Sequence, residues 1–144
     1  MGLTKVTAKI ISLERNAGEF EALFLVDTGA TDSLVPENEL RSIGVQPRGQ
    51  TAYELADGSV MEYAFGLARI EFMGEVTAGR VIFGPADAEP ILGVTALESV
   101  GILVDPANKT LTRLPAIPLK SVEAKEECDV AHNPMMNKRR EYGI

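Results

Sequence analysis

Apolar and polar residues alternate over residues 3–13, and the chain then gathers its apolar residues into a short continuous run at 23–26. Alternation predicts a strand with one buried face, and an apolar run rich in strand-forming residues predicts a buried strand. One side of the first strand is expected to carry Val6, Ala8, Ile10 and Ser12. Asn16-Ala17-Gly18 predicts a turn between the two strands. The pattern therefore predicts a β-hairpin whose second strand ends at Asp27.

The next part of the chain predicts a short strand, a helical segment and a second hairpin. Leu34-Val35 is the strand, and residues 36–44 open with Pro and close with Gly, which favours one or two helical turns. An irregular loop is the alternative for that segment. Asp57-Gly58 stands between residues 53–56 and 59–62, and Asp-Gly between alternating runs is the strongest short-range hairpin signal.

Longer strands and a short helix are predicted in the last part of the domain. Residues 63–72 and 75–83 indicate two strands that turn at Met73-Gly74, and Ile91-Leu92-Gly93 indicates a third. A helix over 96–100 is expected to begin with a capping box formed by Thr95 and Glu98. Two further strands are expected, at 102–104 and 110–114, joined by the turn 105–108.

Composition agrees with an all-β fold. The chain has 144 residues, 45% of them apolar, which suits one domain with a true core. Thirteen glycines and eight prolines are spread between short apolar runs, which favours strands and turns over long helices. We expect a folded domain over residues 1–118 and a flexible polar tail over residues 119–144, where the periodicity disappears.

The charge of the chain argues against a nucleic-acid partner. The formal net charge is −7, and no basic stretch occurs before Lys138-Arg139-Arg140, so few phosphates could be neutralised. The single cysteine, Cys128, excludes an internal disulfide and is compatible with a reducing compartment. Cys128 and His132 stand four residues apart, but these two side chains alone cannot complete a zinc site. We expect no metal and no cofactor.

The N-terminus carries no recognisable targeting signal. It lacks the long apolar segment of a secretory leader, and Val6 stands where a myristoylation signal requires Ser or Thr. No window of the chain has the run of apolar residues that a membrane span needs. These observations predict a cytoplasmic protein without a membrane partner.

The candidate chemistry lies at the end of the second predicted strand, in Asp27-Thr28-Gly29. A carboxylate at the end of a core strand loses hydration, and this costs free energy unless hydrogen bonds or a shared proton compensate. The presence of an acid there therefore points to a function. A plain turn is the alternative interpretation of the tripeptide.

Several features around the tripeptide resemble the retroviral-type (retropepsin-like) aspartic proteases. Small and hydroxyl residues follow it, and Ile91-Leu92-Gly93 matches the later strand that crosses the first in that family. The spacing from Ile70 to Gly93 also follows family members. Only glycine allows two backbones to approach closely without a side-chain clash, which is the part expected of Gly93.

The resemblance implies a fold, an activity and a set of site residues. The fold would be a small closed β-barrel with one short helix near its C-terminal end and a flap hairpin. The activity would be hydrolysis of peptide bonds by water held between two aspartates, with peptides or proteins as substrates. The family pattern places Asp27, Thr28 and Gly29 in the catalytic machinery. It places Ala30, Asp32, Ala56, Asp57 and Gly58 against the substrate, the last three in the flap.

The chain holds a single Asp-Thr-Gly and no internal repeat, so the second aspartate has to come from another subunit. A two-fold homodimer places the same strand end from each protomer at the axis and brings Asp27 against its symmetry mate. The two carboxylates would then share a proton, because two like charges so close together cannot both ionise cheaply; the aspartic proteases are the standard example of this effect.

Two positions depart from the family pattern. Retroviral members pair an Asp directly after the Ala with an Arg after the crossing glycine, and here Thr31 and Val94 occupy those places. Since both partners are absent together, no buried charge is stranded, but one substrate contact and one dimer contact of the family are put in question. Asp32 is either a substrate contact or a solvated turn residue.

Two other functions stay open at the level of sequence. One is a catalytically silent peptide-binding or assembly module that keeps the same fold, since function belongs to the site and not to the fold. The other is an unrelated small β-barrel in which Asp-Thr-Gly occurs by coincidence.

Overall fold

The computed structural model describes residues 4–15 and 17–124 and consists mostly of strands. The described strands are β1 (Lys5–Ser12), β2 (Glu19–Val26), β3 (Ser33–Pro36), β4 (Gly49–Glu54), β5 (Val60–Phe72), β6 (Glu75–Gly84), β7 (Ile91–Leu92), β8 (Ile102–Asp105) and β9 (Thr110–Arg113). The described helices are α1 (Glu37–Ser42) and α2 (Val94–Ser99). The expectation of a β-rich domain with few short helices is confirmed.

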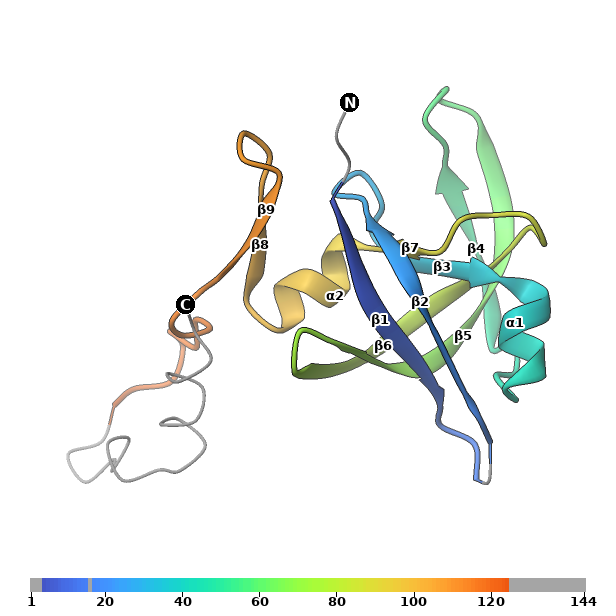
Figure 1. Cartoon of the computed structure of the whole chain (residues 1–144), viewed down its shortest axis with the longest axis horizontal. Helices are drawn as coiled ribbons and strands as arrows, with labels where there is room; N and C mark the ends of the chain where they lie inside the picture. Colours follow the sequence, from blue (N-terminus) through green and yellow to red (C-terminus); the bar gives the residue numbers. More distant parts are fainter. Residues whose placement is uncertain (1–3, 16, 125–144) are drawn as a thin grey trace.

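The main sheet closes on itself. Its strands follow the order β1-β2-β7-β3-β6-β5-β4, and an additional β1–β5 pairing joins the two sides into a ring that leaves β4 outside (Figure 1). The β2–β7 and β3–β6 pairs are parallel, and the other pairs are antiparallel. The largest fully buried side chains include Ile10, Phe24, Ile70, Val81 and Leu92, all from strands of the ring.

The first predicted hairpin is present. β1 and β2 pair antiparallel, and Ala8, Ile10 and Ser12 are buried on one side of β1 as the alternation predicts. Because of this pairing, the end of β2 and the following Asp27 lie at one edge of the ring.

The second and third hairpins share one long strand. The sequence predicts separate segments at 59–62 and 63–72, but β5 runs unbroken through both. Its first half pairs with β4 and its second half with β6 and β1, so one strand carries both a projecting hairpin and the ring. The β5–β6 turn falls at Met73-Gly74 as predicted, and the positive φ of both residues is that of a tight two-residue hairpin.

The structure confirms the first predicted helix and corrects the predicted start of the second. Residues 37–42 are helical, so the loop alternative is wrong, and α1 buries Leu40. The capping box predicted at Thr95 is wrong: α2 begins at Val94 with Gly93 as its N-cap and no side-chain cap. The amides of Val94 and Thr95 instead donate to the carbonyls of Ala30 and Thr31, so the segment after Asp27 takes the place of a side-chain cap.

The last two strands form a separate hairpin. β8 and β9 pair only with each other in the described chain, and they lie to one side of the ring (Figure 1). Residues 115–124 carry no helix or strand, while Cys128 and His132 fall outside the described residues, so the division at residue 118 stays a prediction. Neither described helix has the length and apolar character that a membrane crossing requires.

Candidate active site

Asp27 lies directly after β2, where the ring holds the backbone on both sides. Val26 pairs with Leu92 of β7, and the N–H of Asp27 donates to the Leu92 carbonyl at 3.2 Å. The residue is half-buried. The apolar run that forms β2 therefore ends with a carboxylate whose backbone is fixed by a neighbouring core strand.

The tripeptide folds into a tight turn that holds the Asp27 side chain. The N–H of Gly29 donates to Asp27 Oδ1 at 2.9 Å, and the N–H of Ala30 donates to the Asp27 carbonyl at 3.1 Å. A Cβ at position 29 would lie 3.2 Å from the same Oδ1, so glycine leaves room for this contact. Thr28 and Gly29 are exposed at the apex of the turn, while Ala30 is half-buried.

The predicted close approach at Gly93 is confirmed. A Cβ on Gly93 would lie 2.5 Å from the backbone carbon of Asp32 and 2.8 Å from the Thr31 carbonyl oxygen. The Gly93 N–H donates to Ser33 Oγ at 3.0 Å. The chain after β7 thus crosses the backbone of residues 27–33, which we call the Asp27 loop, in direct contact.

Main-chain hydrogen bonds hold each of the two positions at which the family pattern has an ion pair. The N–H of Val94 donates to the Ala30 carbonyl at 2.8 Å, and that of Thr95 donates to the Thr31 carbonyl at 3.1 Å. The start of α2 therefore remains attached to the Asp27 loop although Thr31 and Val94 carry no charge.

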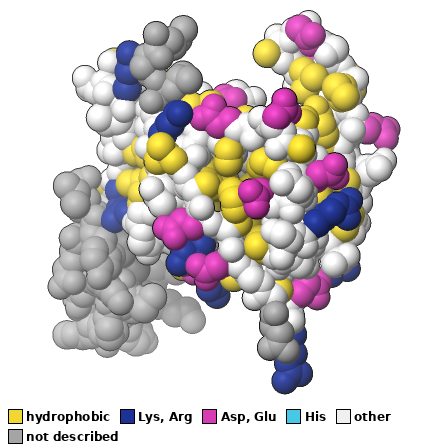
Figure 2. All heavy atoms as spheres, turned by 45° about the vertical axis from the view of Figure 1, so that its right-hand side comes forward, with side chains coloured by type: hydrophobic (Ala, Val, Ile, Leu, Met, Phe, Trp, Pro, Cys, Tyr) yellow, Lys and Arg dark blue, Asp and Glu magenta, His cyan; other side chains and the backbone are white. Residues whose placement is uncertain are grey.

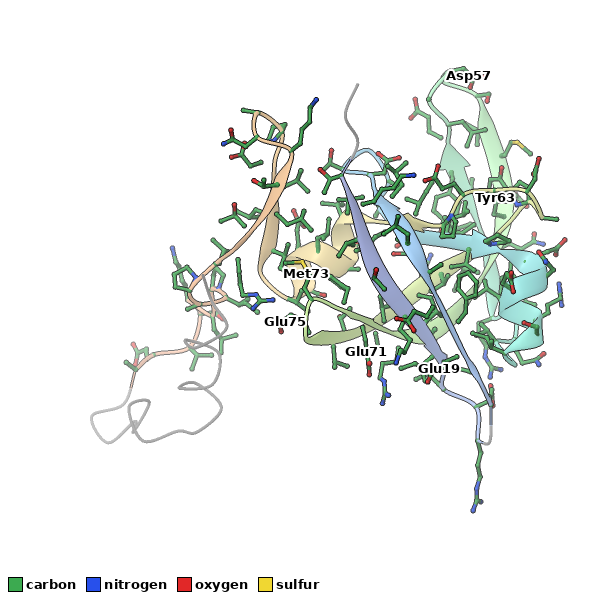
Figure 3. The ribbon with its side chains drawn as sticks, viewed as in Figure 1. Glu19, Asp57, Tyr63, Glu71, Met73 and Glu75 are labelled. Carbon is green, nitrogen blue, oxygen red and sulfur yellow. The ribbon has the colours of Figure 1, made fainter. Side chains whose placement is uncertain are left out.

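The residues predicted to cover the substrate lie at the tip of the projecting β4–β5 hairpin, with Asp57 at its end (Figure 3). Ala56, Asp57 and Gly58 are all exposed, and Gly58 has a positive φ. Asp57 Oδ1 accepts hydrogen bonds from the hydroxyl and the N–H of Ser59, which lower the pKa of Asp57. The Asp57 carboxylate therefore stabilises the turn in which it lies.

The face beside this hairpin carries many apolar side chains. Figure 2 shows hydrophobic side chains gathered on the hairpin and on the surface below it, with acidic side chains scattered among them. Two members of the hairpin, Val60 and Met61, are 65% and 48% exposed. Such exposure of large apolar side chains on a projecting hairpin is typical of a contact surface.

Asp32 has a partner that the sequence did not reveal. Tyr53 of β4 donates its hydroxyl to Asp32 Oδ2 at 2.7 Å. Burial raises the pKa of Tyr53, and the bond to Asp32 raises it further. No periodicity or motif connects residue 53 to residue 32, because only the tertiary fold brings β4 over the Asp27 loop.

The described residues contain no group of three or more His, Cys, Asp or Glu side chains that could hold a metal ion.

A family model described as gag-polyprotein putative aspartyl protease matches residues 15–99. The matched segment begins before β2 and ends with α2, so it contains Asp27, the β4–β5 hairpin and Gly93. No curated protein matches the chain.

Proposed function

The chain belongs to the gag-polyprotein aspartyl protease family, which is retropepsin-like, and from this premise we propose that it is an aspartic endopeptidase active as a homodimer. The observation that carries the proposal is the position of Asp27. Its carboxylate follows a core strand, accepts the Gly29 N–H at 2.9 Å, and sits beside the exposed apex of its turn. A rigidly held acid at an accessible edge is what a shared catalytic pair requires.

The second carboxylate is that of Asp27 in a second copy of the chain. A two-fold axis near the apex of the turn brings the two Asp27 side chains together, and Thr28 holds the partner's loop, a role that its exposure at the apex supports. The pair shares one proton, since the ionisation of one carboxylate opposes that of its neighbour.

The reaction then follows from the shared proton. The ionised Asp27 takes a proton from water, and the oxygen of that water attacks the carbonyl carbon of the scissile peptide. The protonated Asp27 donates a hydrogen bond to the carbonyl oxygen, where negative charge develops. As the C–N bond breaks, the leaving nitrogen receives the proton that the first Asp27 took from water. Both products then leave, and one proton again remains shared between the two carboxylates.

The remaining elements take the parts that the family pattern gives them. The ring of strands serves as the small barrel and the β4–β5 hairpin as the flap. Ala56, Asp57 and Gly58 cover the bound peptide, while Ala30 and Asp32 line its path. The exposed Met61, which pairs with Tyr53 across the hairpin and shares its face, favours extended substrates with apolar side chains.

The cellular setting is part of the same proposal. The acidic composition, the single cysteine and the absence of an early basic stretch support a cytoplasmic protein without nucleic-acid or membrane partners.

The test compares the wild-type chain with Asp27→Asn on a mixed peptide library between about pH 4 and pH 7, a range that includes the upper pKa of such a carboxyl pair. Glu37→Gln is the matched control, because it removes one exposed carboxylate on α1 in the same isosteric way. We expect cleavage by the wild type and by Glu37→Gln, and none by Asp27→Asn. Cleavage retained by Asp27→Asn contradicts the mechanism.

A catalytically silent peptide-binding or assembly module is the second candidate. It is favoured by Thr31 and Val94, which stand where the family has an ion pair that supports the dimer. Sedimentation at micromolar concentration separates the two functions. A dimer that cleaves supports the protease, whereas a monomer without cleavage supports the module.

A further inference from the structure

A side-chain hydrogen bond joins the projecting hairpin to the Asp27 loop. Tyr53 Oη donates to Asp32 Oδ2 at 2.7 Å, and the pair is partly buried. Asp32 lies in the same loop as Asp27, just before β3, whereas Tyr53 lies near the end of β4. The bond therefore couples the element that would cover a substrate to the loop that would cleave it.

The base of the hairpin has a second anchor next to this one. Thr51, two positions before Tyr53 on the same face of β4, accepts a hydrogen bond from Arg80 Nη1 at 2.9 Å. The guanidinium of Arg80 lies over the ring of Phe65, 4.1 Å from its centroid. Such stacking fixes the orientation of an arginine. β4 is thus fixed at residues 51 and 53 to β6 and to the Asp27 loop.

Beyond Tyr53 the hairpin projects without comparable support. Residues 54–62 are exposed except for the half-buried Leu55. The hydrogen bonds described for this segment run within the hairpin, including Leu55 N–H to the Ser59 carbonyl at 2.8 Å and Gly58 N–H to the Leu55 carbonyl at 2.9 Å. Tyr53 therefore marks the boundary between the anchored base and the projecting tip.

We propose that Tyr53 is a positioning residue, which through its hydroxyl bond to Asp32 sets the height and angle of the β4–β5 hairpin over the Asp27 loop. The proposal rests on the function proposed above. One oxygen of Asp32 is held by the phenol, so a substrate side chain that reaches this carboxylate meets its other oxygen. The same bond thus orients the hairpin and limits how a substrate can approach Asp32.

The chemistry of the pair keeps this bond in place at ordinary pH. Burial and the neighbouring Asp32 raise the pKa of Tyr53 and together outweigh Arg80, which lowers it, so the phenol keeps its proton and stays a donor. A hydrogen bond to a charged acceptor is stronger than one between neutral groups, and losing it is expected to change hairpin opening about three- to tenfold.

Hydrogen exchange on the full chain tests the positioning directly, without relying on activity. Tyr53→Phe removes only the hydroxyl, and we expect the amides of residues 54–62 to exchange about three- to tenfold faster than in the wild type. Tyr63→Phe is the matched control on the same hairpin, because the Tyr63 hydroxyl contacts Met61 Sδ at 3.8 Å and does not reach the Asp27 loop. Unchanged exchange in Tyr53→Phe, or equal acceleration in both variants, overturns the proposal.

Steady-state cleavage adds a readout that a purely structural role would not move. A misplaced hairpin weakens substrate binding, so Tyr53→Phe is expected to raise KM about three- to tenfold with little change in kcat. Loss of folded protein lowers the apparent kcat at constant KM instead, and that pattern overturns the proposal. Asp32→Asn, which keeps an acceptor oxygen, is expected to accelerate hairpin exchange less than Asp32→Ala does. If the wild type cleaves nothing, the proposed function fails, and hydrogen exchange alone decides on Tyr53.

Discussion

The main-chain N–H of Gly93 donates to Ser33 Oγ at 3.0 Å, and both residues are buried. Ser33 is only 2% exposed, so neither group has ready access to water in its place. This bond joins the end of the Asp27 loop to the start of α2. Together with the amides of Val94 and Thr95, it fixes the loop where the family pattern has an ion pair.

Ser33→Ala is expected to destabilise the fold by about 1–3 kcal/mol, because it leaves a buried N–H without its acceptor. Urea unfolding, followed by circular dichroism, measures this loss. A variant as stable as the wild type would show that the bond contributes nothing beyond what water supplies.

Gly93→Ala is expected to cost more than Ser33→Ala. Its Cβ would lie 2.5 Å and 2.6 Å from the carbon and oxygen of the Asp32 backbone, which cannot move aside as a flexible side chain could. Overpacking of this kind costs about 1–3 kcal/mol or more, and here it also displaces the Asp27 loop. Gly79→Ala in β6 is the control, since a Cβ there meets no atom within 4 Å. Equal urea midpoints for Gly93→Ala and Gly79→Ala contradict the prediction.

Local patterns of sequence anticipated the hairpins because each hairpin depends on neighbouring residues, whereas the close approach at Gly93 was predicted from the family resemblance. The alternation in β1 and the Asp57-Gly58 turn are signals of this kind. The start of α2 was missed because its capping groups are the carbonyls of Ala30 and Thr31, more than sixty positions away. The Tyr53–Asp32 bond was missed for the same reason, since it exists only after β4 has joined the sheet.

Mixing subunits tests whether each active site needs two chains. If Asp27 of both subunits is required, an equal mixture of wild type and Asp27→Asn with random exchange keeps about one quarter of the activity of wild type alone at the same total protein concentration. If each chain works alone, about one half remains. Peptide cleavage after overnight exchange distinguishes the two values, and mixing with Glu37→Gln controls for handling.

Titration of Tyr53 predicts a weakness at high pH. Burial and the bond to Asp32 raise the folded-state pKa above the ordinary value of about 10. The stabilisation from this group is therefore fully present below about pH 10 and is lost as the pH rises through the folded pKa. Phenolate absorbance should show a late-titrating tyrosine that is missing from Tyr53→Phe. If the tyrosine signal missing from Tyr53→Phe is one that titrates at the ordinary pKa, the assignment of the late titration to Tyr53 is wrong.

Titration of Asp57 predicts a weakness at low pH, at the hairpin tip. The hydroxyl and N–H of Ser59 depress the folded-state pKa of Asp57 below the unfolded value near 4. The turn is therefore stabilised above about pH 4, and this support is lost as the pH falls through the depressed pKa. Amides of residues 54–62, corrected for intrinsic rates, should exchange faster at about pH 3 than at about pH 6.

Two variants distinguish this local effect from destabilisation of the whole fold at low pH. Asp57→Asn keeps a side-chain acceptor in the turn but cannot titrate there, so the pH dependence of hairpin exchange should weaken. Asp105→Asn is the matched control, because the pKa of Asp105 is lowered in the same way in the β8–β9 turn, chiefly by the side chain of Asn108. It should leave the hairpin response intact. A response that persists undiminished in Asp57→Asn would instead point to destabilisation of the whole fold by acid. A response confined to Asp57 means that acid can open the hairpin while the Asp27 loop stays in place.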